Sequence, residues 1–250
     1  MIVLKNWALL RHVVASLKKE SKVQVGPLAQ ATIVFDLDGT LVDTAPDLTN
    51  ALNHVLTARG HAPVSAASVR SSVGFGARAM IEEGLRRAGV NDDVDQMLAA
   101  FLVHYEANIA AQSLPFPGAV AALEALAAAG AKLAVCTNKR EHLTLRLLDA
   151  LNLQGYFAAI AGRDTFPVAK PDPGHLTGVI LRAGGTPANA VMVGDSAVDM
   201  ATARAAEVKA ILVSFGYAVL PLDGPSPDAV IDHFDELAPR ATSLLSGTPR

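Results

Sequence analysis

Short apolar runs alternate with longer amphipathic stretches along the chain from residue 31 onward. Buried strands are predicted at Ala31–Phe35, Lys132–Cys136, Phe157–Ala161, Val191–Val193 and Ala210–Val213, with a further candidate at Asp228–Ile231. Helices are predicted at about 118–129, 140–150, 173–183, 197–206 and 234–246. Because alternating strands and helices build a parallel sheet that is covered on both faces, the pattern predicts an α/β fold with a doubly wound, Rossmann-like parallel sheet.

The first two predicted strands are about 95 residues apart, whereas a simple crossover needs only about a dozen. Apolar residues recur at helical spacing within 48–56, 80–85 and 94–105, so the intervening segment reads as helical throughout. We therefore expect an all-helical cap inserted after the first strand. The expected division is a cap at 47–115 and a core made of residues 31–46 and 116–250.

Residues 1–30 stand apart because five basic residues and one acidic residue give them a balance of +4. Apolar side chains from Leu4 to Leu17 recur at helical spacing and predict a basic amphipathic helix. Lys5 and Arg11 interrupt the apolar centre that a secretory signal requires. Two interpretations stay open: a helix lying on an anionic membrane surface, and a loosely docked extension or start-site artefact, which we favour.

Composition and charge narrow the function classes. Of the 250 residues, 51% are hydrophobic and 18% are charged, which excludes global disorder. The net charge of −3 lacks the basic footprint of a nucleic-acid-binding protein, and no apolar span is long enough for an integral membrane segment. The single cysteine, Cys136, excludes an intrachain disulfide and fits a reducing compartment. We expect a cytoplasmic protein without a nucleic-acid partner, either a monomer or a homodimer.

Candidate chemistry begins where the first predicted strand ends. The segment Ile33–Thr40 runs from apolar residues directly into two carboxylates, Asp36 and Asp38. Parallel sheets place their ligand sites at the carboxyl ends of the strands, so these two acids are candidate site residues. Taken alone, the segment is also compatible with an acidic turn, since Asp and Gly are common turn residues.

Three further signals follow later strands in order. Thr137 and Asn138 come directly after the second predicted strand and offer a hydroxyl and an amide. Lys170 lies in a rigid, proline-containing loop before a predicted helix. Asp195 and Asp199 follow the fourth predicted strand and bring two more acids to the same edge of the sheet.

This ordered set of motifs, which covers residues 31–199, resembles the haloacid dehalogenase superfamily. The resemblance implies a phosphatase in which Asp36 is the nucleophile that forms an aspartyl-phosphate. It implies that Asp38 protonates the leaving oxygen and later deprotonates the attacking water. Three residues are expected to bind the phosphoryl group: Thr137, Asn138 and Lys170.

The same resemblance implies Mg²⁺, because four acids crowded together would repel one another without a hard cation. The expected ligands are Asp36, the backbone carbonyl of Asp38, and Asp195. Asp199 is expected to complete the metal site, acting behind the direct ligands. The other interpretation of Asp199 is an acid favoured by the dipole at a helix N-terminus.

The wider sequence, over about residues 31–240, is similar to the phosphoglycolate phosphatase branch of the superfamily. This similarity implies a small phosphorylated metabolite as substrate: 2-phosphoglycolate, or alternatively an amino-sugar acid phosphate or pyrophosphate. Arg78 is the cap cation best placed in the sequence to bind a substrate carboxylate, and a solvated surface residue is its other interpretation. Arg163 and Glu207 stand where relatives typically carry glycine.

Two other functions are weighed against hydrolysis. A sugar phosphomutase would share the fold, but Thr40 favours hydrolysis because the mutases tend to carry an aliphatic residue there. A non-catalytic phosphate-binding or membrane-associated module would use residues 1–30, and the presence of the whole acid and lysine set disfavours it. The seven histidines show no ligand spacing and are expected to be surface residues or satisfied buried ones.

Overall fold

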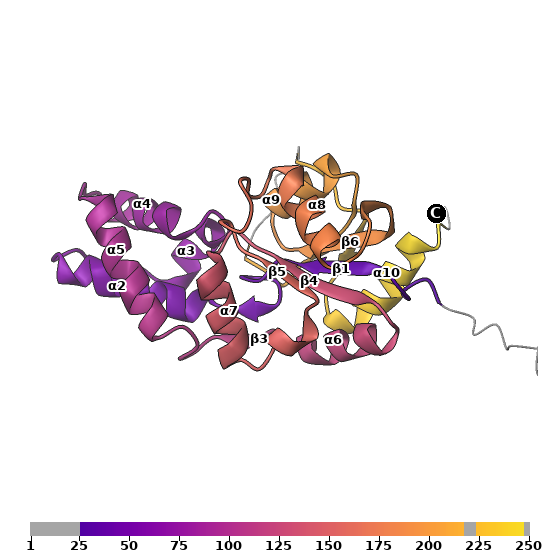
Figure 1. Cartoon of the computed structure of the whole chain (residues 1–250). Helices are drawn as coiled ribbons and strands as arrows, with labels where there is room; N and C mark the ends of the chain where they lie inside the picture. The colour runs from indigo at the N-terminus through magenta and orange to yellow at the C-terminus, as the bar shows by residue number, and fades with distance from the viewer. Residues whose placement is uncertain (1–25, 218–223, 248–250) are drawn as a thin grey trace, which may run out of the picture.

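A computed structural model describes residues 26–217 and 224–247 of the chain. Within these residues, six parallel strands form one sheet in the order β5-β4-β1-β6-β7-β8 (Figure 1). Their bounds are β1 Thr32–Phe35, β4 Lys132–Cys136, β5 Ala159–Ala161, β6 Ala190–Gly194, β7 Lys209–Val213 and β8 Ala229–Ile231. The predicted parallel sheet is confirmed, including its candidate last strand. The amphipathic helix predicted from Leu4 to Leu17 lies outside the described residues.

The two faces of the sheet bury alternate residues of the same strands. In β1, Ile33 and Phe35 belong to the core on one face, and Val34 belongs to the core on the other. The first face is covered by α6 (Ala119–Ala128), α7 (Glu141–Ala150) and α10 (Leu237–Leu245), and the second by α8 (Pro173–Arg182) and α9 (Ala197–Ala205) (Figure 1). Short 3-10 helices lie at Gln154–Tyr156, Pro187–Asn189 and Phe234–Glu236. Burial on both faces explains why the strands are apolar at nearly every position, and it confirms the doubly wound arrangement.

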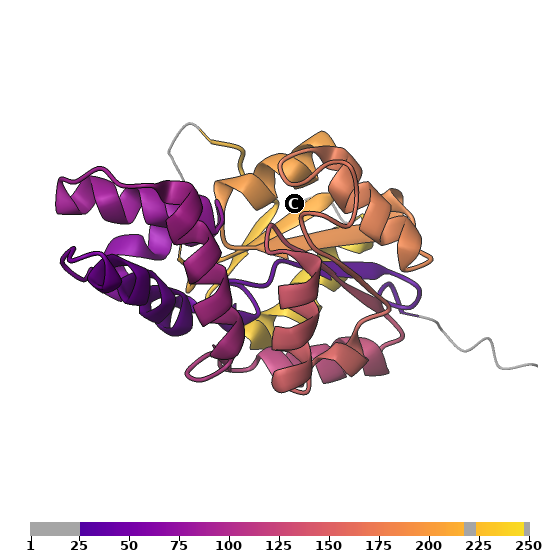
Figure 2. The same cartoon turned by 60° about the vertical axis from the view of Figure 1, so that its left-hand side comes forward.

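Four helices lie beyond one edge of the core instead of covering the faces of the sheet (Figures 1 and 2). We call them the cap helices: α2 (Ala45–Ala58), α3 (Ala66–Val73), α4 (Ala77–Ala88) and α5 (Val94–Ala107). Helix α2 contacts each of the other three, and its apolar stripe packs against theirs. The predicted all-helical insertion is confirmed, while its boundaries at residues 47 and 115 stay a prediction.

A short antiparallel ribbon marks where the chain leaves the core and where it returns. Strand β2 (Val42–Asp43) pairs with β3 (Leu114–Pro115). Beside the ribbon, the buried carboxylate of Asp47 accepts hydrogen bonds from the backbone N–H groups of Gln112 and Ser113, at 2.8 to 3.0 Å. These bonds join the two ends of the inserted segment at the base of the cap helices.

Several described helices end in a residue with the left-handed backbone conformation, and two of these ends can be compared directly. Gly130 follows α6 with a φ of +83°, and Glu207 follows α9 at the same offset with a φ of +56°. Glycine adopts this conformation without a steric penalty, whereas glutamate carries a Cβ that disfavours it.

The longest described helices, α2 and α5, have 14 residues each, and no described helix has the length and hydropathy to cross a bilayer.

Candidate active site

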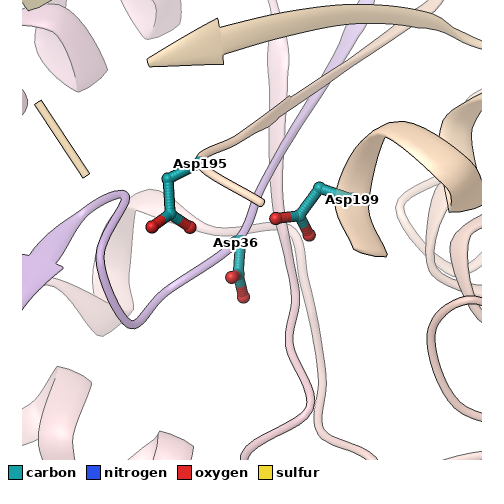
Figure 3. A group of neighbouring side chains, drawn as sticks. All are labelled: Asp36, Asp195 and Asp199. Carbon is teal, nitrogen blue, oxygen red and sulfur yellow. The ribbon is translucent and has the colours of Figure 1, made fainter. Parts of the chain in front are cut away.

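Three buried aspartates meet at the carboxyl ends of neighbouring strands (Figure 3). Asp36 directly follows β1, Asp195 directly follows β6, and Asp199 lies in the first turn of α9. One carboxylate oxygen from each residue lies within 4.8 Å of those of the other two. Because β1 and β6 are adjacent parallel strands, the sheet itself brings the first two acids together.

Lys170 joins two of these acids. Its Nζ lies 2.9 Å from Oδ1 of Asp36 and 2.6 Å from Oδ1 of Asp199, and its side chain is almost fully buried. Burial alone would lower the pKa of Lys170, but the two facing carboxylates raise it above its usual value. The lysine is therefore a fixed positive charge beside Asp36 and Asp199.

The cluster still carries an excess of negative charge, since it contains three carboxylates and Lys170 contacts only two of them. Burial raises the pKa of Asp36 to about 7, and the charges of Asp199 and Asp195 add to this shift while Lys170 opposes it. A buried group of carboxylate oxygens that repel one another fits a hard divalent cation, which prefers oxygen ligands. The described residues therefore include a cluster that could bind a metal ion.

Asp199 is held by contacts at both of its oxygens. Besides the ion pair with Lys170, its Oδ2 accepts a hydrogen bond from Oγ of Ser196 at 2.6 Å, and its own N–H donates to that hydroxyl at 3.3 Å. Together these bonds form a capping box at the start of α9. Asp199 is thus an acid at a helix N-terminus, as the second interpretation of this residue in the sequence expects. It also holds Lys170 in place through the ion pair.

Asp195 is fixed by residues far away in the sequence. Its Oδ1 accepts a hydrogen bond from the Thr40 hydroxyl at 3.3 Å, and its Oδ2 accepts one from the backbone N–H of Tyr217 at 2.7 Å. Gly39, with a φ of +86°, passes so close that a Cβ there would come within 2.5 Å of Oδ2 of Asp195. The loop after β1 therefore requires glycine, both for its conformation and for its approach to this acid.

Lys139 and Asp38 form an ion pair that the sequence did not predict. Its Nζ lies 2.9 and 3.1 Å from the two carboxylate oxygens of Asp38, and only 5% of the lysine side chain is exposed. The ammonium also lies 4.7 Å from the ring centroid of Tyr105, which belongs to α5. Burial alone would lower the pKa of Lys139, but the charge of Asp38 and the contact with Tyr105 raise it. The signal in the sequence was the position of Lys139, directly after two candidate phosphate-binding residues.

Thr137 and Asn138 lie in the loop between β4 and α7, and α7 itself begins only at Glu141. The buried Thr137 hydroxyl accepts a hydrogen bond from the N–H of Lys139 at 3.2 Å. The side-chain amide of Asn138 donates to the carbonyl of Lys170 at 3.2 Å, while its Oδ1 has no hydrogen-bond partner among the described residues. These contacts hold the loop against the lysine-bearing segment.

His175 fixes the backbone that carries Lys170, and sequence reasoning set it aside with the other histidines. Its Nδ1 accepts a hydrogen bond from the N–H of Lys170 at 3.2 Å, so Nε2 carries the proton and donates to the Gly162 carbonyl at 3.0 Å. Burial, followed by the charge of Lys170, lowers the pKa of His175 to about 4. The ring is therefore neutral near pH 7, as expected for a satisfied buried histidine.

A cavity of about 500 Å³ lies between the cap helices and the polar residues at the carboxyl edge of the sheet. The core contributes polar side chains to its wall: Asp36, Asp38, Thr137, Asn138 and Lys139. The cap helices contribute mainly apolar ones: Leu48, Val73, Met80, Leu98, Phe101 and Leu102. Arg78 also lines the cavity, but its guanidinium is paired with Asp95 and its side chain is 49% exposed. The cavity thus joins an acidic, polar floor to an apolar roof.

Fold and site together define a capped α/β enzyme whose acidic centre lies at the carboxyl edge of a parallel sheet. A family model described as haloacid dehalogenase-like hydrolase matches residues 33–213, and the chain belongs to this family.

Relatives are similar over nearly their whole length. The phosphoglycolate phosphatase of Mesorhizobium japonicum is 48% identical over 213 residues, which cover 84% of this chain and 94% of the relative. That of Caulobacter vibrioides is 46% identical over 222 residues, which cover 88% of this chain and 94% of the relative. A crystal structure from Haemophilus somnus, described as a predicted phosphoglycolate phosphatase, has a TM-score of 0.78 at 28% identity and covers 85% of this chain and 98% of that one.

Proposed function

We propose that this protein is a Mg²⁺-dependent phosphomonoesterase that hydrolyses 2-phosphoglycolate to glycolate and phosphate. The observation that carries the proposal is the pair of carboxylates on the first loop, each held by its own buried lysine. Lys170 contacts Asp36, and Lys139 contacts Asp38. The relatives named above support the choice of substrate.

Asp36 acts as the nucleophile in this proposal. Its carboxylate oxygen attacks phosphorus, and the bond between phosphorus and the ester oxygen breaks to leave an aspartyl-phosphate. The departing oxygen takes a proton from Asp38, which lies two residues further on. Asp38 then takes a proton from water, whose oxygen attacks phosphorus and releases both phosphate and the Asp36 carboxylate.

The remaining polar residues stabilise the charge of the transferring group. Lys170 offers a buried positive charge beside the nucleophile, and Thr137 and Asn138 lie on the adjoining wall of the cavity. Fixed donors of this kind stabilise charge in the transition state without having to reorganise during the reaction. We assign these three residues to the phosphoryl group.

The residues that would hold Mg²⁺ are Asp36, the backbone carbonyl of Asp38, and Asp195. Asp199 supports this set through Lys170 and Ser196, because its own oxygens are engaged by those residues. When bound, the cation supplies positive charge that offsets the repulsion between the nucleophile and the phosphoryl oxygens. Three buried carboxylates, only two of which contact an ammonium group, are the observation that supports a cation here.

A phosphate-release assay over a panel of esters tests the proposal. The panel contains 2-phosphoglycolate, pyrophosphate, an amino-sugar acid phosphate and a hexose phosphate, each with Mg²⁺ and with excess EDTA. We expect the highest kcat/KM for 2-phosphoglycolate, loss of turnover in EDTA and recovery on adding Mg²⁺. Full activity in EDTA would exclude Mg²⁺ dependence. A higher kcat/KM for another ester would make that ester the substrate in place of 2-phosphoglycolate.

A further inference from the structure

The cavity presents several cations to a substrate, and they differ in how they are held. Among the described residues, the basic side chains that line it are Arg78, Lys139, Arg140 and Arg163. Arg78 is half exposed and paired with Asp95, and Arg140 and Arg163 are exposed to solvent. Lys139 alone of these four is buried, with 5% of its side chain exposed. A buried cation at a ligand site interacts more strongly with an anion because water screens it less.

The position of Lys139 matches the chemistry of the leaving group. Asp38, the proposed proton donor, must approach the ester oxygen that departs, and Lys139 Nζ lies 2.9 and 3.1 Å from its carboxylate oxygens. In 2-phosphoglycolate only one methylene group separates the ester oxygen from the carboxylate. A substrate placed for proton transfer from Asp38 therefore brings its carboxylate into the neighbourhood of Lys139.

The neighbouring buried lysine is not free to take this role. Lys170 already contacts Asp36 and Asp199 at 2.9 and 2.6 Å, on the phosphoryl side of the site. Lys139 has three donor hydrogens and contacts one carboxylate and the face of the Tyr105 ring. The ring holds the ammonium from the cap side through a cation–π contact. Lys139 can therefore serve a second anion while it stays beside Asp38.

We propose that Lys139 binds the carboxylate of the leaving group, so that preference for an anionic phosphate ester is set by a core residue beside the proton donor. This inference rests on the proposed function and names the residue that selects its substrate. Arg78 on the cap then contributes less to the selection of an anionic substrate than the sequence predicts, where it is the cap cation best placed to bind a carboxylate. The ammonium would lie between two carboxylates, that of Asp38 and that of the substrate.

The test compares two substrates that differ only in charge: 2-phosphoglycolate and glycolamide phosphate, in which a neutral amide replaces the carboxylate. We expect Lys139→Met to lower kcat/KM for 2-phosphoglycolate about ten- to a hundredfold more than for glycolamide phosphate, the loss of one charged hydrogen bond. Lys139→Arg keeps the charge and should keep much of the preference. Lys209→Met, at an exposed lysine that begins β7 at the end of the strand opposite to the site, is the matched control and should leave the ratio unchanged.

Glycolate inhibition gives a second readout that does not depend on turnover of the acid substrate. With glycolamide phosphate as substrate, Lys139→Met should lose competitive inhibition by glycolate and retain inhibition by inorganic phosphate. Each preference is the ratio of two kcat/KM values measured on one preparation, so a misfolded fraction lowers both values equally and leaves the ratio unchanged. If Lys139→Met is insoluble, Lys139→Gln takes its place.

Two results would overturn the inference while leaving the proposed function in place. Equal losses on both substrates would mean that Lys139 only positions Asp38. A loss of preference in Arg78→Ala, but not in Lys139→Met, would move carboxylate recognition to the cap. If instead the wild-type enzyme fails to hydrolyse 2-phosphoglycolate, the proposed function fails, and this inference fails with it.

Discussion

At the scale of single residues, two carboxylates on one loop are kept distinct by different lysines. Asp36 is paired with Lys170, which also holds Asp199, whereas Asp38 is paired with Lys139 in the polar wall of the cavity. Each acid therefore has its own environment although only one residue separates them. In the proposed mechanism, this separation lets one carboxylate attack phosphorus while the other moves a proton.

The first prediction concerns the nucleophile. Asp36→Asn keeps the size of the side chain but removes the charged oxygen that attacks phosphorus, so we expect kcat to fall on the order of 10³-fold or more. Circular dichroism should match that of the wild type, because the amide still fits between Lys170 and the strand end. Substantial remaining turnover in a purified, folded variant would remove Asp36 from this role.

The second prediction concerns His175 and pH. Its pKa lies near 6.5 in the unfolded chain and about 4 in the folded protein, so the unfolded chain binds more protons between these values. The stability that comes from a neutral His175 is fully present above about pH 6.5 and is lost as the pH falls toward 4.

Urea unfolding at several pH values between 7 and 5 tests this dependence. The free energy of unfolding of the wild type should fall more steeply than that of His175→Asn, by up to about 1.4 kcal/mol per pH unit. Parallel curves for the two proteins would show that His175 does not carry the dependence.

How far the sequence predicts the site depends on how local each contact is. Acids and lysines that follow strand ends could be found because the sheet edge collects them, as for Asp36 and Asp195. Two other contacts could not be found, because Lys139 lies 101 positions from Asp38 and Tyr217 lies 22 positions from Asp195. His175 is a satisfied buried histidine, as one of the two interpretations expects, but its contact with the backbone N–H of Lys170 could not be predicted because no motif records it.

At the scale of elements, strands were predicted well because burial on both faces makes them continuous apolar runs, and long helices because burial of one face gives them a helical period. The ribbon of β2 and β3 was missed, since strands of two residues are too short to form such a run. Helix α3 was not distinguished within the helical insertion, and its stretch contains few buried apolar side chains.

The third prediction is that Glu207→Gly stabilises the protein. Glu207 has a φ of +56° at the end of α9, where a residue with a Cβ is strained. Glycine removes this strain but loses more backbone entropy on folding, so the net gain should be about 0.5–1 kcal/mol. Calorimetry should then show Tm higher by about 1–4 °C.

The control is Ala206→Gly at the preceding position, where φ is −86° and glycine brings no relief of strain. This variant should lower Tm slightly. Equal shifts at positions 206 and 207 would show that the left-handed conformation is not the cause.

At the scale of the whole molecule, the core and the cap are joined through Tyr217. Its backbone N–H donates to Asp195 in the acidic cluster, while its hydroxyl donates to Asp43 at 2.6 Å and accepts from the N–H of Ala45 at 2.9 Å. Asp43 lies in β2, and α2 begins at Ala45. One side chain therefore links the acidic cluster to the segment that leads into the cap.

The fourth prediction follows from this link. Tyr217→Phe removes the hydroxyl and leaves a buried N–H and a carboxylate without their partner, so the free energy of unfolding should fall by about 1–3 kcal/mol. Tyr156→Phe is the matched control, since its hydroxyl makes an exposed hydrogen bond to Glu124. Urea unfolding measures both, and equal changes in the two variants would contradict the proposed link.

The central claim, that Asp36 carries the phosphoryl group during the reaction, is tested most directly by trapping it. In Asp38→Asn the base for the second step is missing, and p-nitrophenyl phosphate has a leaving group that needs little help from an acid. Acid quenching followed by tandem mass spectrometry should locate a phosphoryl group on Asp36 alone. Release of p-nitrophenol with no phosphoryl group on Asp36, or with one on another residue, would contradict the account.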